Sequence, residues 1–154
     1  MFDRRKFMLK SLLALVGVNG LSAVANADDI EILVYKSPTC GCCNAWIEHL
    51  RGAGFVVRQR NVADVSPIKN RHGVPSQLWS CHTAVIGGYV IEGHVPAHDI
   101  RRLLDEAPDV DGLAVPGMPA GSPGMEAGDY REAFNVWTFG GDELEAYARY
   151  TDRG

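Results

Sequence analysis

Three of the four cysteines in this 154-residue chain stand together as Cys40-Gly41-Cys42-Cys43, and the fourth lies in Ser80-Cys81-His82-Thr83. Cys40 and Cys43 have the C-x-x-C spacing of redox-active disulfides, in which one thiolate attacks and the other resolves. Cys42 is a third thiol that such exchange does not need. Thiolates that gather in one place bind soft d¹⁰ ions, so copper(I) and zinc(II) are the metals to compare.

The spacing of the cysteines favours copper over zinc. Common zinc ribbons use two separated C-x-x-C pairs, a pattern that this sequence does not contain. The side chains of the adjacent residues Cys42 and Cys43 diverge, which hinders chelation of one tetrahedral ion but allows them to bridge several ions. We therefore expect a copper(I) site, with more than one ion, whose ligands are Cys40, Cys42, Cys43 and Cys81.

Histidine can complete such a site, because imidazole is a common ligand of copper and zinc. His82 adjoins Cys81, and His94 follows a glycine at the end of a predicted hairpin, so both are candidate ligands. His49 on the first predicted helix and His72 in a loop are expected to be solvated surface residues.

Met118 and Met125 are the only methionines after residue 27, and both border a segment rich in proline and glycine. A loop is an unusual place for a core methionine, and a thioether is a soft ligand, so both residues are candidate copper ligands. The alternative, in which each methionine fills an apolar gap, stays open.

The elements that must position these side chains alternate between strands and helices. A buried strand ends just before Cys40, a helix follows the cysteine cluster, and Gly87-Gly88 marks a hairpin. This pattern predicts an α/β sandwich with a mixed sheet. The expected strands cover residues 30–35, 55–62, 83–86 and 89–92, and the expected helices follow the cluster and cover 66–71 and 96–106.

This layout resembles the thioredoxin and glutaredoxin fold, in which the active-site C-x-x-C begins the first helix. There, free N–H groups and the helix dipole stabilise thiolate. In proteins with the thioredoxin or glutaredoxin fold, a cis-proline precedes the third strand and faces the active-site cysteines. Cys81 and His82 stand at that place here, which removes the usual substrate-docking proline and adds a thiol and an imidazole.

The composition changes after Ala107. A Pro/Gly-rich C-terminal extension begins, with a loop expected over about 108–128. Four aromatic residues within 130–139 predict that the extension packs back on the domain. Residues 143–150 are expected to form one or two helical turns.

Five motifs together resemble the CopG-type copper-resistance family of exported bacterial proteins. They are Val34-Tyr35-Lys36-Ser37-Pro38-Thr39-Cys40-Gly41-Cys42-Cys43, Ser80-Cys81-His82-Thr83, Glu92-Gly93-His94-Val95-Pro96, Val115-Pro116-Gly117-Met118-Pro119 and Gly121-Ser122-Pro123-Gly124-Met125-Glu126. The resemblance implies a thioredoxin-like fold and a cysteine-bridged copper(I) cluster in periplasmic copper handling. The motif cysteines are carried over as ligands, and so are His82, His94, Met118 and Met125.

Residues 1–27 are expected to be a cleaved export signal, which leaves 28–154 as a single metal-binding domain. A basic start with Arg4-Arg5, a short apolar stretch and Ala25-Asn26-Ala27 support export to the periplasm. The arginine pair resembles the twin-arginine export signal, and the choice between that route and the Sec route stays open. The apolar stretch is too short for a membrane-spanning helix, so no stable membrane insertion is expected after cleavage. The net charge of −4 argues against a nucleic-acid partner.

Two main functions compete on these residues. The first is a periplasmic copper-binding protein in copper resistance, with copper ions and other copper-handling proteins as partners and with copper redox cycling as an option. The second is a thiol–disulfide oxidoreductase that uses Cys40 as nucleophile and Cys43 as resolving thiol, which leaves open whether the chain is an enzyme. A zinc-stabilised structural module ranks last, because a domain of this size can bury enough core to fold without metal.

Overall fold

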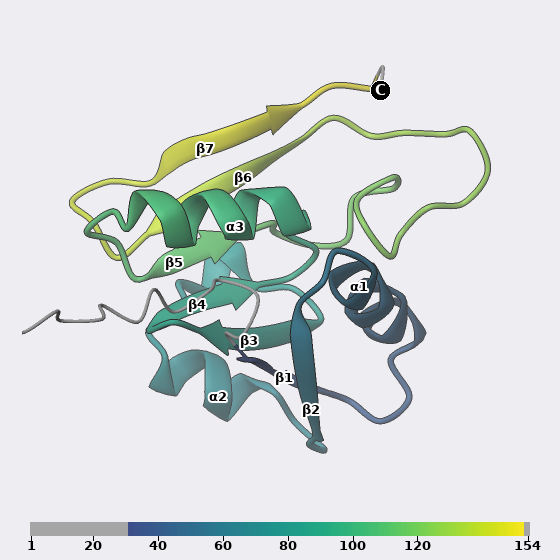
Figure 1. Ribbon diagram of the computed structural model, residues 1–154, viewed down its shortest axis with the longest axis horizontal. Helices are drawn as coiled ribbons and strands as arrows, with labels where there is room; N and C mark the ends of the chain where they lie inside the picture. Colours follow the sequence, from purple (N-terminus) through teal and green to yellow (C-terminus); the bar gives the residue numbers. More distant parts are fainter. Residues whose placement is uncertain (1–30, 153–154) are drawn as a thin grey trace, which may run out of the picture.

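The computed structural model describes residues 31–152, so the predicted export signal at 1–27 lies outside the described residues. The described chain is a mixed α/β sandwich built on one seven-stranded sheet (Figure 1). Its elements in chain order are β1 (Glu31–Lys36), α1 (Gly41–Gly52), β2 (Val56–Asn61), α2 (Ser66–Arg71), the short 3₁₀ helix η2 (Ser76–Leu78), β3 (His82–Ile86), β4 (Tyr89–Glu92), α3 (Ala97–Glu106), β5 (Gly112–Ala114), β6 (Phe134–Phe139) and β7 (Glu145–Tyr150).

The sheet has the strand order β2-β1-β3-β4-β5-β6-β7. β1 is parallel to β2 and antiparallel to β3, and β4 is antiparallel to β3 but parallel to β5. The crossover through α1 explains the first parallel pair, and the Gly87-Gly88 turn explains the β3–β4 hairpin. The predicted mixed sheet and the predicted order of elements up to α3 are therefore confirmed.

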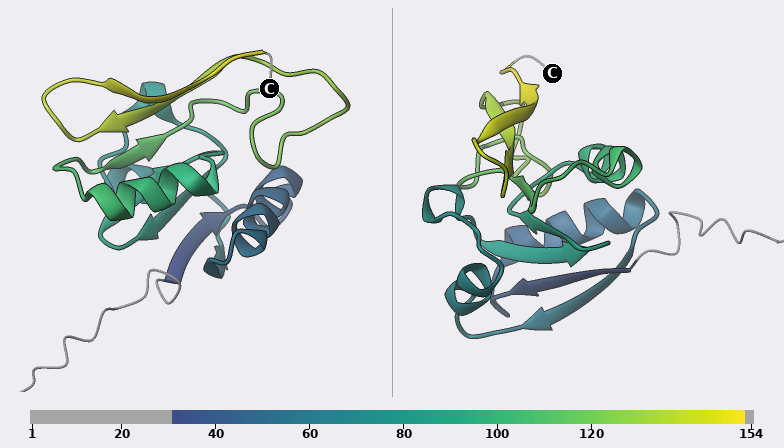
Figure 2. Two further views of the ribbon diagram at one scale, coloured as in Figure 1. Left: turned by 45° about the horizontal axis from the view of Figure 1, so that its top comes forward. Right: turned by 90° about the vertical axis from the view of Figure 1, so that its left-hand side faces the viewer.

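The helices lie on both faces of the sheet, with α1 and α3 on one face and α2 on the other (Figures 1 and 2). The main core fills the α1/α3 face. Ile32 and Val34 alternate inward along β1 and meet Trp46 and Leu50 of α1 and Ile100 of α3, all fully buried. The indole N–H of Trp46 donates to the Val95 carbonyl at 2.9 Å, so the largest core side chain leaves no unpaired polar atom.

The C-terminal extension is more regular than its composition predicts. Within the expected loop at 108–128, residues 112–114 form β5, because their backbone pairs with both β4 and β6. The expectation that the aromatic segment packs back is confirmed by β6, which lies antiparallel to β5.

The expectation of helical turns over 143–150 is wrong, because this segment contains strand β7. β7 extends the sheet beside β6 and is tied to α3 by two tyrosines. The hydroxyl of Tyr147 donates to Glu106, and that of Tyr150 donates to Asp99. These contacts between distant parts of the chain outweigh the local helical pattern. In the described part of the chain, none of the helices has the length and apolar character needed to cross a membrane.

Candidate metal centre

Two loops at one end of the sheet bring the four cysteines together. Cys40 is the N-cap of α1, and Cys42 and Cys43 lie in the first turn of that helix. Cys81 immediately precedes β3. Because β1 and β3 are antiparallel and Lys36 pairs with His82, the loop that leaves β1 lies beside the segment that enters β3. Sheet register therefore places the isolated cysteine next to the cluster.

The sulfur atoms of all four cysteines lie within 4.8 Å of one another. Cys40 and Cys43 form a disulfide, whereas Cys42 and Cys81 are free and partly buried. The Cys42 Sγ lies 3.4 Å from the Cys40 Sγ and 3.7 Å from the Cys81 Sγ. Cys42 thus stands between the disulfide and the fourth cysteine, within reach of both.

Both predicted histidines contact Cys81. Its Sγ lies 3.2 Å from His82 Nδ1 and 3.1 Å from His94 Nε2, so these three residues form a second group with metal-ligand spacing. His94 Nδ1 lies 2.8 Å from the Pro123 carbonyl, which can only accept a hydrogen bond. In the neutral ring, Nδ1 therefore carries the proton and Nε2 turns its lone pair toward Cys81.

The surroundings keep both imidazoles neutral, as a metal ligand must be. Burial lowers the pKa of His82 well below its usual range, with His94 and Lys69 adding to the effect. Burial also lowers the pKa of His94. His82 packs on Trp46, with ring centroids 4.3 Å apart, and its Nε2 is a buried atom without a hydrogen-bond partner among the described residues.

The two methionines differ in position. The Met118 sulfur lies 3.9 Å from the Cys42 Sγ, and the side chain is 51% exposed, so it stands at the outer rim of the centre. Met125 takes part in the turn through its backbone, with its N–H bonded to the Ser122 carbonyl. Within residues 31–152, no hydrogen bond joins the Met125 sulfur to the cysteines, so its role as a ligand stays a prediction.

Burial raises the pKa of the Cys81 thiol to about 12, and the neighbouring Cys42 thiol is the second cause of this rise. The helix-terminus argument made for the cluster does not apply to Cys81, which precedes a strand. In the metal-free protein this sulfur carries its proton, which a bound metal ion must displace.

His49 is not the solvated surface residue that the sequence suggests. It is partly buried, and its Nε2 accepts the backbone N–H of Ala97 at 3.1 Å. The imidazole therefore satisfies a free N–H at the start of α3 and links α1 to α3. Periodicity placed His49 on α1 but gave no sign of this partner. The sequence also gave no sign of the Pro123 carbonyl that orients His94.

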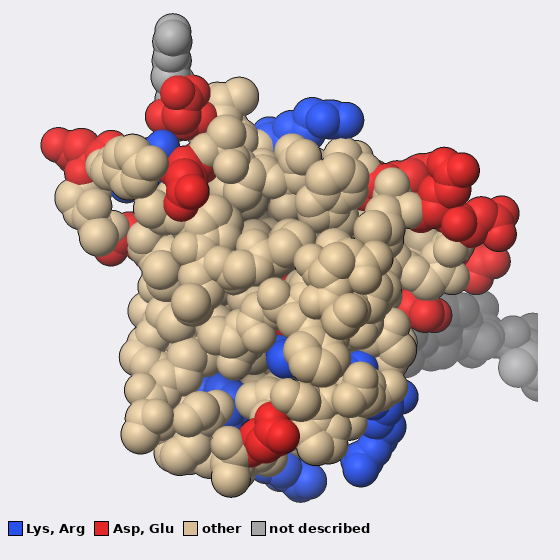
Figure 3. Space-filling model, turned by 180° about the vertical axis from the view of Figure 1, so that it is seen from behind, with Lys and Arg blue, Asp and Glu red and all other residues tan. Residues whose placement is uncertain are grey.

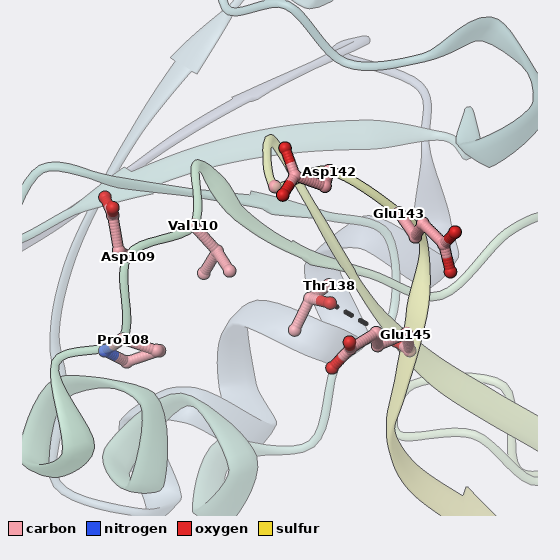
Figure 4. A pocket seen from close by; sticks show the side chains of 8 residues that line it. Pro108, Asp109, Val110, Thr138, Asp142, Glu143 and Glu145 are labelled. Carbon is pink, nitrogen blue, oxygen red and sulfur yellow. Dashed lines mark hydrogen bonds between the residues drawn. The ribbon is translucent and has the colours of Figure 1, made fainter.

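A surface pocket has a volume of about 490 Å³ (Figure 4). No cysteine lines this pocket, so it is separate from the candidate metal centre. Its carboxylates are hard oxygen ligands, unlike the soft sulfur of the centre. Figure 3 shows the back of the molecule, where acidic side chains gather near the upper corners and most of the visible basic ones lie in the lower half. The pocket is lined by Pro108, Asp109, Val110, Thr138, Gly141, Asp142, Glu143 and Glu145.

The chain is similar to a known protein family and to two solved structures. A family model described as a protein of unknown function, DUF411, matches residues 78–125, the stretch from before Cys81 to Met125. Two solved structures, both described as "Copper resistance protein copG", in Form 2 and Form 1, are 48% and 47% identical to the chain. Each covers 79% of this chain and 98% of its own length, with a TM-score of 0.75. The chain belongs to the CopG copper resistance protein family.

Membership of the CopG family confirms the resemblance that the five motifs predicted. It also agrees with the predicted mixed α/β fold. A search of curated proteins gave no match. The four converging cysteines fit the copper binding that the names of the CopG structures suggest.

Proposed function

We propose that this protein binds copper(I) in the periplasm as a cysteine-bridged cluster and serves copper resistance. The observation that carries the proposal is the convergence of Cys40, Cys42, Cys43 and Cys81 within 4.8 Å. Four sulfurs at this spacing, with a third thiol between a C-x-x-C pair and a distant cysteine, suit several soft ions better than one tetrahedral ion.

Three further side chains would complete the cluster. His82 and His94 offer neutral imidazole nitrogens beside Cys81, and Met118 offers a thioether beside Cys42. Met125 remains a proposed ligand without a supporting contact. The export signal at 1–27, the twin-arginine route and the thioredoxin-like class belong to the same proposal, the last supported by the strand order β2-β1-β3-β4 with Cys40 at the start of α1.

The Cys40–Cys43 disulfide connects this site to copper redox chemistry. Binding through all four thiolates requires reduction of the disulfide by two electrons, supplied by a thiol reductant. In the reverse direction, two Cu(II) ions each take one electron from the two thiolates, which gives two Cu(I) ions and the disulfide. Two Cu(II) ions added to the fully reduced protein should thus remove two free thiols. Persistence of all four thiols would contradict this redox role.

The direct test of the cluster is the copper(I) stoichiometry of Cys42→Ser. We expect the reduced wild-type protein to take up more than one copper(I) ion per chain. The Cys42→Ser variant should bind fewer ions while its circular dichroism spectrum is unchanged, because Cys42 is partly buried but lies outside the apolar core. An unchanged stoichiometry would rule out a cluster bridged by Cys42.

A thiol–disulfide oxidoreductase is the second candidate, favoured by the Cys40–Cys43 disulfide itself. It predicts reduction of insulin or peptide disulfides by metal-free protein. The informative variant replaces both Cys42 and Cys81 by serine and leaves the pair intact. Turnover by this variant would support the oxidoreductase, and its absence would count against it.

A further inference from the structure

A buried polar network lies on the α2 face of the sheet, beneath the segments that carry Cys81 and His94. We propose that Glu92, paired with Lys69, is a positioning residue that holds these segments in the geometry needed to bind copper(I). The inference rests on the proposed function, because it assigns a role toward the same site. Neither residue carries a ligand atom in that proposal, and the sequence motifs did not single out Lys69.

One carboxylate anchors both sides of the Cys81–His82 segment. Glu92 Oε1 accepts the backbone N–H of Ser80 at 2.6 Å, and Glu92 Oε2 accepts the hydroxyl of Thr83 at 2.7 Å. Ser80 and Thr83 directly flank the two proposed ligands. Glu92 therefore holds the backbone just before Cys81 and the side chain just after His82.

Lys69 fixes the carboxylate in turn. Its Nζ lies 2.5 Å from Glu92 Oε1 and 3.0 Å from the Thr83 hydroxyl, and its side chain reaches across from α2. Both ionic groups are almost fully removed from water, with side chains 5% and 0% exposed. Burial raises the pKa of Glu92, and Lys69 is the main group opposing this effect.

The same glutamate begins the turn that carries His94. Gly93 follows it at φ 72°, and its N–H donates to the His82 carbonyl at 3.1 Å. A Cβ at Gly93 would meet the Val115 carbonyl at 2.5 Å and the Ser80 Cβ at 2.6 Å. The Glu92–Gly93 backbone therefore packs directly on the segment before Cys81, and His94 is the next residue.

The contacts continue to the rim of the centre. The hydroxyl of Ser80, whose N–H is held by Glu92, donates to the carbonyl of Gly117, next to Met118. Three segments that carry proposed ligands thus meet at Ser80 and Glu92. By contrast, Cys40, Cys42 and Cys43 are positioned by α1 and lie outside this network.

A gain in fold stability is a weak explanation for a charged pair at this place. Replacing a buried ion pair by apolar side chains of similar volume is often neutral or stabilising, whereas removing one partner is costly. Side chains that orient metal ligands typically change metal affinity by about 10–100-fold when they are replaced. These two expectations separate a positioning role from a purely structural one.

The test compares copper(I) affinity with stability in Glu92→Gln and in the double variant Lys69→Met/Glu92→Gln. Affinity is measured on the fully reduced protein by competition with a copper(I) chelator, and stability by urea unfolding. We expect both variants to bind copper(I) about 10–100-fold more weakly. The double variant should recover stability relative to Glu92→Gln without recovering affinity, because its neutral pair still lacks the carboxylate.

Asp99→Asn is the matched control, since Asp99 is also a buried carboxylate but bonds Tyr150 on the β7 side of α3. It should lose stability and keep its copper(I) affinity within about twofold. If Glu92→Gln does not fold, Thr83→Val removes one of the two anchors and should still weaken affinity. Affinity within about twofold of wild type in the folded variants would overturn the positioning role. Failure of the wild-type protein itself to bind copper(I) would instead overturn the proposed function.

Discussion

At the scale of single residues, His94 shows how the backbone orients an imidazole toward the Cys81 sulfur. The Pro123 carbonyl accepts a hydrogen bond from its Nδ1–H, and burial keeps the ring neutral, so the Nε2 lone pair faces the Cys81 Sγ. The types and spacing of the cysteines and histidines were sufficient to predict this set of side chains. The Pro123 carbonyl was not predictable, because any residue offers a carbonyl and only the folded loop brings this one to the imidazole.

Replacing His94 by glutamine should weaken copper(I) binding by about 10-fold or more, because the oriented nitrogen beside Cys81 is lost. Competition with a copper(I) chelator measures the change. His72→Gln is the matched control, since His72 lies in the turn after α2, away from the contacts of the cysteines. Equal affinities of His94→Gln and His72→Gln would remove His94 from the site.

At the scale of elements, the Pro/Gly-rich loop matters because it lies directly on the first turns of α1. Gly124 has φ 87°, and a Cβ at this residue would lie 2.7 Å from the backbone nitrogen of Trp46 and 2.9 Å from the carbonyl oxygen of Cys42. The sequence predicted a loop around Gly124 from its prolines and glycines. It could not predict β5 or β7, because three residues of β5 and the tyrosines of β7 find their partners only in distant strands and in α3.

The loop contact predicts different effects for two glycines with positive φ. Gly128→Ala meets no atom within 4 Å, so it should cost only the backbone strain of about 1–3 kcal/mol in the free energy of unfolding. Gly124→Ala adds a collision with the backbone of α1 and should also weaken copper(I) binding, because it lifts the loop that carries Met118 and Pro123. Urea unfolding and chelator competition measure both. Equal losses in the two variants would contradict the contact.

At the scale of the whole molecule, half-buried and buried imidazoles couple stability to pH. Burial lowers the pKa values of His49, His82 and His94 below the ordinary value of 6.5. The unfolded chain therefore binds more protons, so this contribution to stability is present above about pH 6.5 and is lost as the pH falls. Glu92 has the opposite sign, because burial raises its pKa and its contribution is lost as the pH rises.

With three imidazoles against one carboxyl, the copper-free protein should unfold at lower urea concentration at pH 5.5 than at pH 7.5. Each pKa unit by which an imidazole is lowered corresponds to about 1.4 kcal/mol. His49→Gln should reduce the difference in urea midpoint between pH 5.5 and pH 7.5, because it removes one of the three imidazoles. A midpoint at pH 5.5 equal to or above that at pH 7.5 would contradict this linkage.

The overall architecture was predictable up to α3, because local patterns of strand, helix and turn follow one another there in the order of a mixed sheet. The grouping of cysteines at the candidate metal centre was predictable, since three of the four share one helix start. The buried pair of Lys69 and Glu92 was not predictable, because charged residues are expected on the surface by default. Only the folded sheet shows them buried beneath Cys81.

The central claim is that four cysteines hold copper(I) together. The most direct measurement is elemental analysis with a count of free thiols on the protein purified without oxygen from copper-supplemented cells. We predict more than one copper ion per chain and, after the metal is removed under denaturing conditions, four free thiols. Metal-free protein with two free thiols, Cys42 and Cys81, would contradict the copper cluster and favour the Cys40–Cys43 oxidoreductase.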